Sequence, residues 1–379
     1  KCFLVIRAFK QLGKAITSAS DYIEEFNYFN VAITKIADEN KKNYKQYGYD
    51  DAESYAESFK TRLTELTGKM SGFKIDKNGE LSDSGMQNLW PDVKEIMNFE
   101  SRVAQITNSV GMLGEASVYS SKALTMLSGD LSSLTNTNLQ QVMDNLSSGM
   151  TGMTAAVKKY GMDISVASLR QYALDLGIQK NLSSMTQAEK MYLRVIAMLD
   201  QSKVAWGDLA NTINQPANQF RMLKNNIKAT GMMIGKLFMP MVSAVLPYLN
   251  AMTMAIKDLV QWIGDLFGIK WDNNNIAAPD NSGWDNLEED VNDTAGAIDK
   301  ATDAQKKFNK QLMGFDELNN ISKNEKDSAD GNKGNGNGED VSGVLSDALI
   351  NAVEEYEKRW NKAFDGMTSK ADELKQKIE

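Results

Sequence analysis

The sequence predicts an all-α fold in which long helices flank a compact multi-helix domain. Only 5 of the 379 residues are proline, and because proline breaks helices, so few of them favour long helical runs. Apolar residues recur at spacings of three and four along most of the chain, which is the period of an amphipathic helix. Alternation typical of strands occurs around residues 73–81, where it predicts one short β-hairpin.

Shifts in composition divide the chain into five expected segments. They are long N-terminal helices with the hairpin over 1–98, a compact helical domain over 99–228, an apolar segment over 229–270, an acidic flexible linker over 271–340 and a C-terminal amphipathic or coiled-coil helix over 341–379. The linker contains a glycine-rich run at 331–338, which is a composition typical of flexible connections.

The first seventy residues carry two apolar stripes of helical spacing. Phe26, Phe29 and Ile33 belong to the second stripe. Gly48 marks a break, and Asp50 or Asp51 is placed to cap the helix that follows, because an aspartate side chain accepts hydrogen bonds from the first backbone N–H groups of a helix.

The hairpin prediction rests on Asn78-Gly79, a pair favoured in type I′ turns. A calcium loop is the alternative, since Asp76, Asn78, Glu80 and Asp83 all offer oxygen ligands. An EF-hand loop requires glycine at position six and glutamate at position twelve. Counted from Asp76, Gly79 is at position four and Gln87 at position twelve, so the turn is the better interpretation.

The central segment contains several sequence signals for the starts and ends of helices. Leu139, Val142 and Leu146 form one apolar helix face. Gly177 is predicted to follow the end of another helix, where glycine readily adopts a left-handed conformation. Thr186 and Glu189 form a capping-box pattern that opens the next helix. We therefore expect several short helices that bury a core of their own.

The most apolar stretch, 237–256, has no charged residue and lies between Lys236 and Lys257. Its length is close to the roughly 20 residues that a bilayer span needs, although Pro240 and Pro247 interrupt it. Two interpretations stay open: insertion into a membrane, and burial against protein. Both can hold in succession, with burial first and contact with lipid later. The candidate membrane-active residues are Leu237, Phe238, Val242, Val245, Leu246, Leu249 and Ile256.

The C-terminal segment carries a long apolar stripe with steps of four, four and three. An eleven-residue repeat of this kind keeps a stripe almost straight along a helix. Association with a partner helix or with other copies is one interpretation, and an amphipathic helix lying on a globular body is the other. The candidate helix-association residues are Leu345, Leu349, Val353, Tyr356, Trp360, Phe364 and Met367.

Composition excludes several classes of chemistry. The chain has no histidine and one cysteine, Cys2, so it lacks the residues for histidine triads, histidine-containing metal sites or an internal disulfide. Carboxylate pairs lie in charged runs typical of solvated faces, and the methionine cluster at 232–254 is better explained by packing than by metal ligation. We therefore expect no enzyme, no cofactor and no metal site.

The formal net charge is −8, which argues against specific nucleic-acid binding. Much of the acidity lies in 271–340. The chain begins at Lys1 without methionine or a signal-peptide pattern, and we expect it to be an internal or C-terminal piece of a longer protein.

Several blocks of the central region resemble the tail tape measure proteins of long-tailed bacteriophages, of the type that infects Gram-positive hosts. These blocks are Gly114-Glu115-Ala116-Ser117, Ser121-Lys122-Ala123-Leu124, Asp130-Leu131-Ser132-Ser133-Leu134, Tyr160-Gly161-Met162-Asp163-Ile164-Ser165, Tyr172-Ala173-Leu174-Asp175-Leu176-Gly177-Ile178, Met185-Thr186-Gln187-Ala188-Glu189-Lys190, Gly207-Asp208-Leu209-Ala210 and Pro216-Ala217-Asn218-Gln219-Phe220-Arg221. The island Leu312-Met313-Gly314-Phe315-Asp316-Glu317-Leu318-Asn319 extends the resemblance, which spans about residues 45–320.

The resemblance implies a virion structural protein in the tail tube lumen or at the tail tip. Such proteins contribute to tail length and assembly, form helical bundles that are commonly homotrimers, and contact tail tube and distal tail proteins. They are made in the host cytoplasm, leave the tube ahead of the DNA and in some cases help the genome cross the host membrane. Helix ends interrupt 99–211 too often for one long continuous helix. We therefore expect this region to be a folded part near the tail tip, and not the part whose length sets the length of the tail.

Two rival functions belong to other classes. A helical pore-forming or membrane-inserting protein outside a virion shares the amphipathic helices and the apolar segment. A coiled-coil adaptor accounts for both ends of the chain but not for the uncharged stretch at 237–256.

Overall fold

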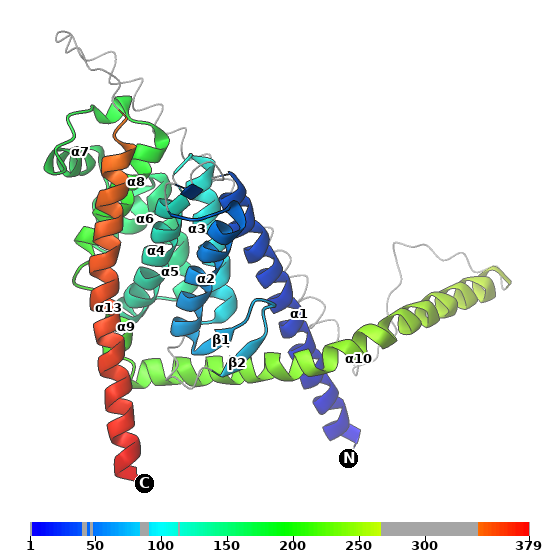
Figure 1. Ribbon diagram of the computed structural model, residues 1–379. Coiled ribbons are helices and arrows are strands. Elements are labelled where there is room, and N and C mark those ends of the chain that lie inside the picture. Colours follow the sequence, from blue (N-terminus) through cyan, green and yellow to red (C-terminus); the bar gives the residue numbers. More distant parts are fainter. Residues whose placement is uncertain are drawn as a thin grey trace. The chain divides into compact units, whose positions relative to one another are not determined.

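The computed structural model describes residues 2–39, 44–45, 48–83, 91–112, 114–266 and 340–378 (Figure 1). Contacts divide the chain into two compact units, one made of residues 1–20 and 231–310 and the other of residues 21–230 and 311–379.

The fold is all-α apart from one small hairpin, which confirms the predicted class. The elements are α1 (Cys2–Glu39), α2 (Ala52–Ser71), β1 (Phe73–Ile75), β2 (Leu81–Asp83), α3 (Val93–Ser109), α4 (Gly114–Thr135), α5 (Leu139–Thr151), α6 (Thr154–Lys158), α7 (Val166–Asp175), the 3₁₀ turn η2 (Leu182–Ser184), α8 (Gln187–Gln201), α9 (Asp208–Asn211), α10 (Pro216–Leu266) and α13 (Ser342–Ile378).

Helix α4 forms the centre of the larger unit. It packs against α2, α3, α5, α8, α9 and α13, and most of its side chains are buried. Many of these are small hydroxyl residues, which let neighbouring helices approach closely. Some of their hydroxyls donate to backbone carbonyls: the Ser128 hydroxyl donates to Thr125 O within α4, and the Ser121 hydroxyl donates to Glu100 O of α3. The buried hydroxyl oxygens of Ser120 and Thr125 have no hydrogen-bond partner in the described part of the chain.

The helix ends predicted from short-range signals are confirmed. Asp51 caps α2 by accepting a hydrogen bond from Ser54 N at 2.7 Å. Thr186 and Glu189 form a complete capping box at the start of α8. Gly177 follows the end of α7 with a φ of +75°. Each of these signals depends only on residues a few positions apart, which is why sequence alone predicts them.

The predicted hairpin is present, with Ile75 opposite Leu81 in an antiparallel ladder. Its turn is not the type I′ turn that we expected. Gly79 has a φ of +78°, but Asn78 does not adopt a positive φ, and a type I′ turn requires both. Instead, Asp76 Oδ1 accepts hydrogen bonds from Asn78 N and Glu80 N. The Asp76 carboxylate thus holds a three-residue loop that ends in a left-handed glycine.

In the smaller unit, the first part of α1 and residues 231–266 of α10 pack together. They meet at Gly235, where the Ala15 backbone lies so close that no Cβ atom fits at the glycine position. The predicted linker over 271–339 lies outside the described residues.

Candidate interaction surfaces

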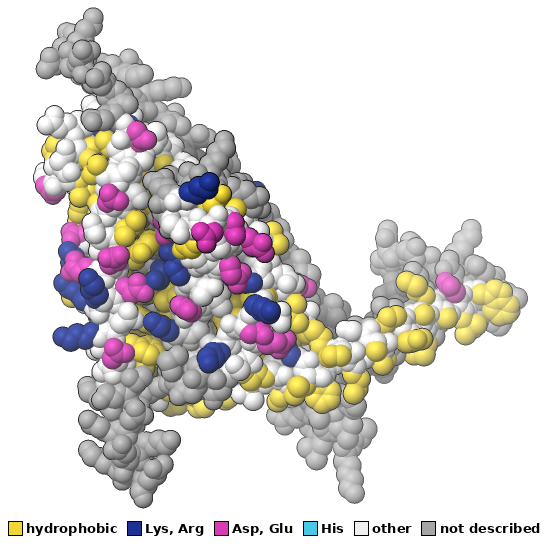
Figure 2. Space-filling model, in the orientation of Figure 1, with side chains coloured by type: hydrophobic (Ala, Val, Ile, Leu, Met, Phe, Trp, Pro, Cys, Tyr) yellow, Lys and Arg dark blue, Asp and Glu magenta, His cyan; other side chains and the backbone are white. Residues whose placement is uncertain are grey.

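Helix α10 presents a long apolar face to solvent. Of the candidate membrane-active residues, Leu237, Phe238 and Val245 are exposed and Val242 is half-buried, while the side chains of Leu246, Leu249 and Ile256 lie outside the described part. Figure 2 shows the apolar side chains that follow this helix. An exposed apolar patch of this length marks an interaction site.

Within the described residues, no helix combines the length and the apolar character needed to cross a membrane.

Helix α13 is docked onto the larger unit, along α8, α4 and α9 (Figure 1). All seven of its candidate association residues are buried there: Leu345, Leu349, Val353, Tyr356, Trp360, Phe364 and Met367. The structure thus matches the interpretation of an amphipathic helix lying on a globular body. In this conformation these seven side chains have no free face for other copies of the chain, and association with other copies through them stays a prediction.

The start of α13 is attached to α8 through Glu189. Glu189 Oε1 accepts hydrogen bonds from Val341 N at 3.2 Å and from Lys180 Nζ at 2.8 Å, while Oε2 accepts from Thr186 N. Burial raises the pKa of Glu189, but these hydrogen bonds outweigh it and the pKa lies below its usual value. The capping-box glutamate therefore also positions the C-terminal helix, a role that short-range sequence signals do not reveal.

The middle of α13 is attached to the interior through Asp130. This buried carboxylate accepts hydrogen bonds from the Tyr356 hydroxyl at 2.6 Å, from Gly207 N at 2.8 Å and from Leu209 N at 2.9 Å. Burial raises the pKa of Asp130 to about 7, although all three hydrogen bonds lower it. Trp206 stacks on the Tyr356 ring with centroids 4.5 Å apart. One acidic side chain thus joins α4, α9 and α13.

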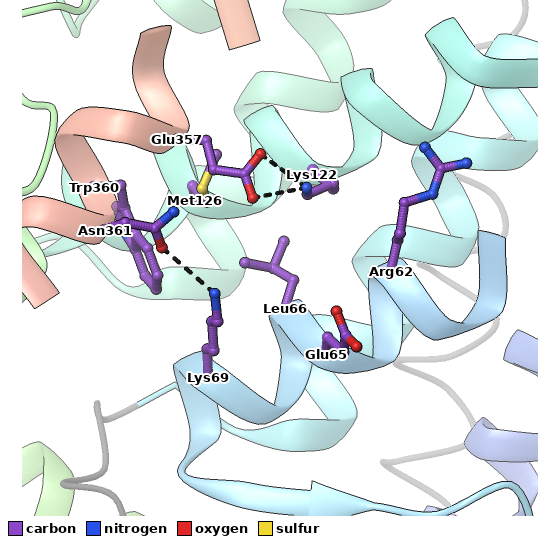
Figure 3. A pocket seen from close by; sticks show the side chains of 9 residues that line it. All are labelled: Arg62, Glu65, Leu66, Lys69, Lys122, Met126, Glu357, Trp360 and Asn361. Carbon is purple, nitrogen blue, oxygen red and sulfur yellow. Dashed lines mark hydrogen bonds and ion pairs between the residues drawn. The ribbon is translucent and has the colours of Figure 1, made fainter. Parts of the chain in front are cut away.

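A small cavity of about 40 Å³ lies between α2, α4 and α13 (Figure 3). Lys122 Nζ pairs with both carboxylate oxygens of Glu357 at 2.9 Å, and Lys69 donates to Asn361 Oδ1 at 3.5 Å. The buried Nε1 of Trp360, which also lines the cavity, has no hydrogen-bond partner. The cavity has room for a water molecule, and the Lys122–Glu357 ion pair and the Lys69–Asn361 hydrogen bond join α13 to the body of the protein.

An open groove of about 480 Å³ runs along α2 and the hairpin. Four lysines line it, among them Lys60 and Lys74, together with three carboxylates, among them Glu65 and Asp76. This mixture of charges favours neither an anionic nor a cationic ligand.

Other buried titratable groups have structural partners. Glu100 is fully buried and accepts a hydrogen bond from the Thr67 hydroxyl, and burial raises its pKa well above the usual value. Arg194 donates to Met150 O at the C-terminal end of α5, and burial lowers its pKa to about 10. No group of histidine, cysteine, aspartate or glutamate residues in the described part of the chain is arranged to hold a metal ion. The buried side chains of Glu100 and Arg194 therefore join neighbouring helices.

Comparison of the chain with family models, with curated proteins and with solved structures finds no match.

Proposed function

We propose that this chain is part of a structural tape measure protein of a bacteriophage tail. In this proposal it lies in the tail tube lumen or at the tip, takes part in tail assembly and length determination, and leaves during DNA ejection to help the genome cross the host membrane. It does so as a set of packed helices, without catalysis. The sequence blocks that resemble tape measure proteins and the all-α fold support this proposal.

One observation carries the proposal: the block at 130–134 is joined by hydrogen bonds to two later blocks, 207–210 and 216–221, more than 70 positions along the chain. Asp130 accepts hydrogen bonds from the backbone of Gly207 and Leu209. The Asn218 side chain donates to the Ser133 hydroxyl at 3.0 Å. Because these contacts join polypeptide segments, they support a structural role for the residues behind the resemblance.

The same packing supports a folded, tip-proximal role for 99–211. Fully extended as one helix, this region would span about 170 Å, at 1.5 Å per residue. Its helices instead fold back on one another around α4, as shown by the contacts of α4 with α3, α5, α8 and α9. A region folded in this way adds little to the length of protein that sets the tail length.

A truncation series in the phage that encodes the chain tests this assignment. We expect in-frame deletions within 99–211 to abolish infectivity without shortening tails by about 1.5 Å per deleted residue. Tail lengths are measured by electron microscopy. If tails shorten in proportion to the deletion and infectivity is retained, the length of this region sets the tail length and our assignment is wrong.

A helical membrane-inserting protein outside a virion is the second candidate, favoured by the exposed Leu237 and Val245 on α10. Two measurements separate the candidates. A tail protein copurifies with tail tube protein in particles from infected cells. A membrane-inserting protein is absent from these particles, and the full chain releases dye from liposomes in a manner that is lost with Leu237→Asp and Val245→Asp.

A further inference from the structure

The groove along α2 and the hairpin contains one edge of strand β1. At the loop end of the hairpin, Asp76 N donates to Glu80 O at 3.1 Å. Positions that bond across an antiparallel pair alternate with positions whose N–H and C=O groups point the other way. The backbone groups of Phe73 and Ile75 therefore point away from β2.

This edge of β1 faces α2. Phe73 O lies 2.7 Å from the place that a Cβ atom would take at Gly68, so α2 and β1 touch at one end of the groove. At the other end, Lys60 Nζ donates to Lys77 O at 3.3 Å. Between these two contacts, neither the N–H nor the C=O of Ile75 has a hydrogen-bond partner in the described part of the chain. A strand edge with such groups recognises the backbone of another extended segment.

The groove has the length of a short peptide. Lys60 and Gly68 are eight residues apart on α2, which corresponds to about 12 Å along a helix. An extended chain rises about 3.3 Å per residue, so three or four residues fit between the two contacts. The volume of about 480 Å³ also lies in the range of roughly 300–1,000 Å³ that is usual for ligand sites.

The side chains of the groove favour an uncharged segment. Thr61 and Thr64 lie on the α2 wall between the two contacts, and the half-buried Ile75 lies on the β1 wall. The charged Glu65 also lines the small cavity beside α13. Lysines and carboxylates are both present around this stretch, and an uncharged centre with a charged rim is typical of protein interfaces.

We propose that this groove, here called the α2–β1 groove, binds a short extended segment of a partner protein. The segment lies beside β1 as an added strand and exchanges hydrogen bonds with the N–H and C=O of Ile75. These bonds recognise a peptide backbone, while the threonines and Ile75 favour small or apolar side chains. The inference rests on α2 and β1 alone and does not depend on the proposed tail function.

A peptide titration of the full chain, followed by NMR with isotope-labelled isoleucine, tests the groove. The probe is the acetylated and amidated peptide Thr-Val-Thr-Val-Thr. The control probe is the same peptide with every backbone nitrogen methylated, which removes its N–H donors. We expect the amide signal of Ile75 to shift with a dissociation constant of about 1 mM or below for the probe, and to stay in place with the control probe.

Matched variants of α2 show whether the peptide lies in the groove. Thr61 and Glu53 are both exposed on α2, but only Thr61 lines the groove. Thr61→Trp fills the groove and should weaken binding by at least about 10-fold, whereas Glu53→Trp should leave binding unchanged. Equal circular dichroism spectra and melting temperatures establish that both variants fold. An Ile75 signal that does not move, equal binding of the two peptides, or equal binding by the two variants overturns the proposal.

Discussion

At the scale of single residues, Tyr356 shows how one hydrogen bond joins the C-terminal helix to the interior. Its hydroxyl donates to Asp130 at 2.6 Å, and both side chains are buried. Burial and the nearby Asp130 carboxylate raise the pKa of Tyr356 well above its usual value, so the hydroxyl keeps its proton and remains a donor. The hydroxyl therefore remains a donor to Asp130 both below and above the pKa of that carboxyl group, which is about 7.

Replacing Tyr356 by phenylalanine should lower the free energy of unfolding by about 1–3 kcal/mol, the usual cost of removing one partner from a buried charged hydrogen bond. Asp130 keeps its two backbone donors, so the fold itself should persist. Tyr172→Phe is the matched control, because its hydroxyl donates to Asp200 at 2.8 Å on the surface. Urea denaturation compares the two variants. Equal losses would mean that burial does not strengthen the Tyr356 contact.

Residue-level predictions from the sequence succeed where partners are close in the chain. Thr186 and Glu189 are three residues apart, and their capping box follows directly from that spacing. Asp130 lies within α4 among ordinary helical residues, and its partner Tyr356 lies 226 positions away. Nothing local distinguishes such an aspartate from a solvated one, because only tertiary packing brings its donors together.

At the scale of elements, α13 and α10 differ in whether the described part of the chain covers their apolar side chains. The stripe of α13 repeats every eleven residues, stays almost straight, and is buried along the body of the same chain. Apolar residues of α10, among them Leu237 and Val245, are exposed. The sequence predicts the stripe of α13 and the uncharged stretch at 237–256. It does not predict which of them the same chain covers, because that depends on the shape of the surface that α8, α4 and α9 build together.

Two valines of α13 test how strongly the docked stripe holds the helix. Val353 is fully buried and Val344 is 51% exposed. Val353→Ala should lower the free energy of unfolding by about 2 kcal/mol, from lost apolar burial and the cavity left behind. Val344→Ala, with the same change in helix propensity, should alter it by less than about 0.5 kcal/mol.

Thermal or urea unfolding measures both valine variants. Limited proteolysis adds a readout specific to the element, since a loosened α13 exposes cleavage sites near Arg359 and Lys362. If Val353→Ala and Val344→Ala behave alike, α13 does not contribute to stability through this face.

The hairpin is a smaller element for which prediction was correct in kind and wrong in detail. Asn78-Gly79 located the turn, but the Asp76 side chain, by accepting two backbone N–H groups, selects a three-residue loop. The same carboxylate had suggested a calcium ligand. Its oxygen is engaged with the backbone, which gives Asp76 a structural role in the turn.

At the scale of the whole molecule, the absence of histidine leaves carboxyl groups to determine how stability responds to pH between about 4 and 7. Burial raises the pKa of Glu25, Glu95, Glu100 and Asp130. The folded state therefore binds more protons than the unfolded state above about pH 4.5, and stability should fall as pH rises through this range. Carboxyl groups whose pKa is lowered in the folded state, such as Asp163 and Asp200, change the stability only below about pH 4.5.

Urea denaturation between pH 4.5 and pH 8 tests this expectation. Asp130, with a pKa of about 7 in the folded state and 3.8 as its ordinary value, contributes a decline that levels off as the pH rises through about 7. Asp130→Asn should remove that part of the slope, and Glu100→Gln should reduce what remains, because burial raises the pKa of both carboxyl groups in the folded state. Asp163→Asn, an exposed aspartate with a lowered pKa, should leave the slope unchanged. A stability that rises with pH, or a slope that Asp130→Asn preserves, would mean that Asp130 is already ionised in the folded state and that its three hydrogen bonds outweigh burial.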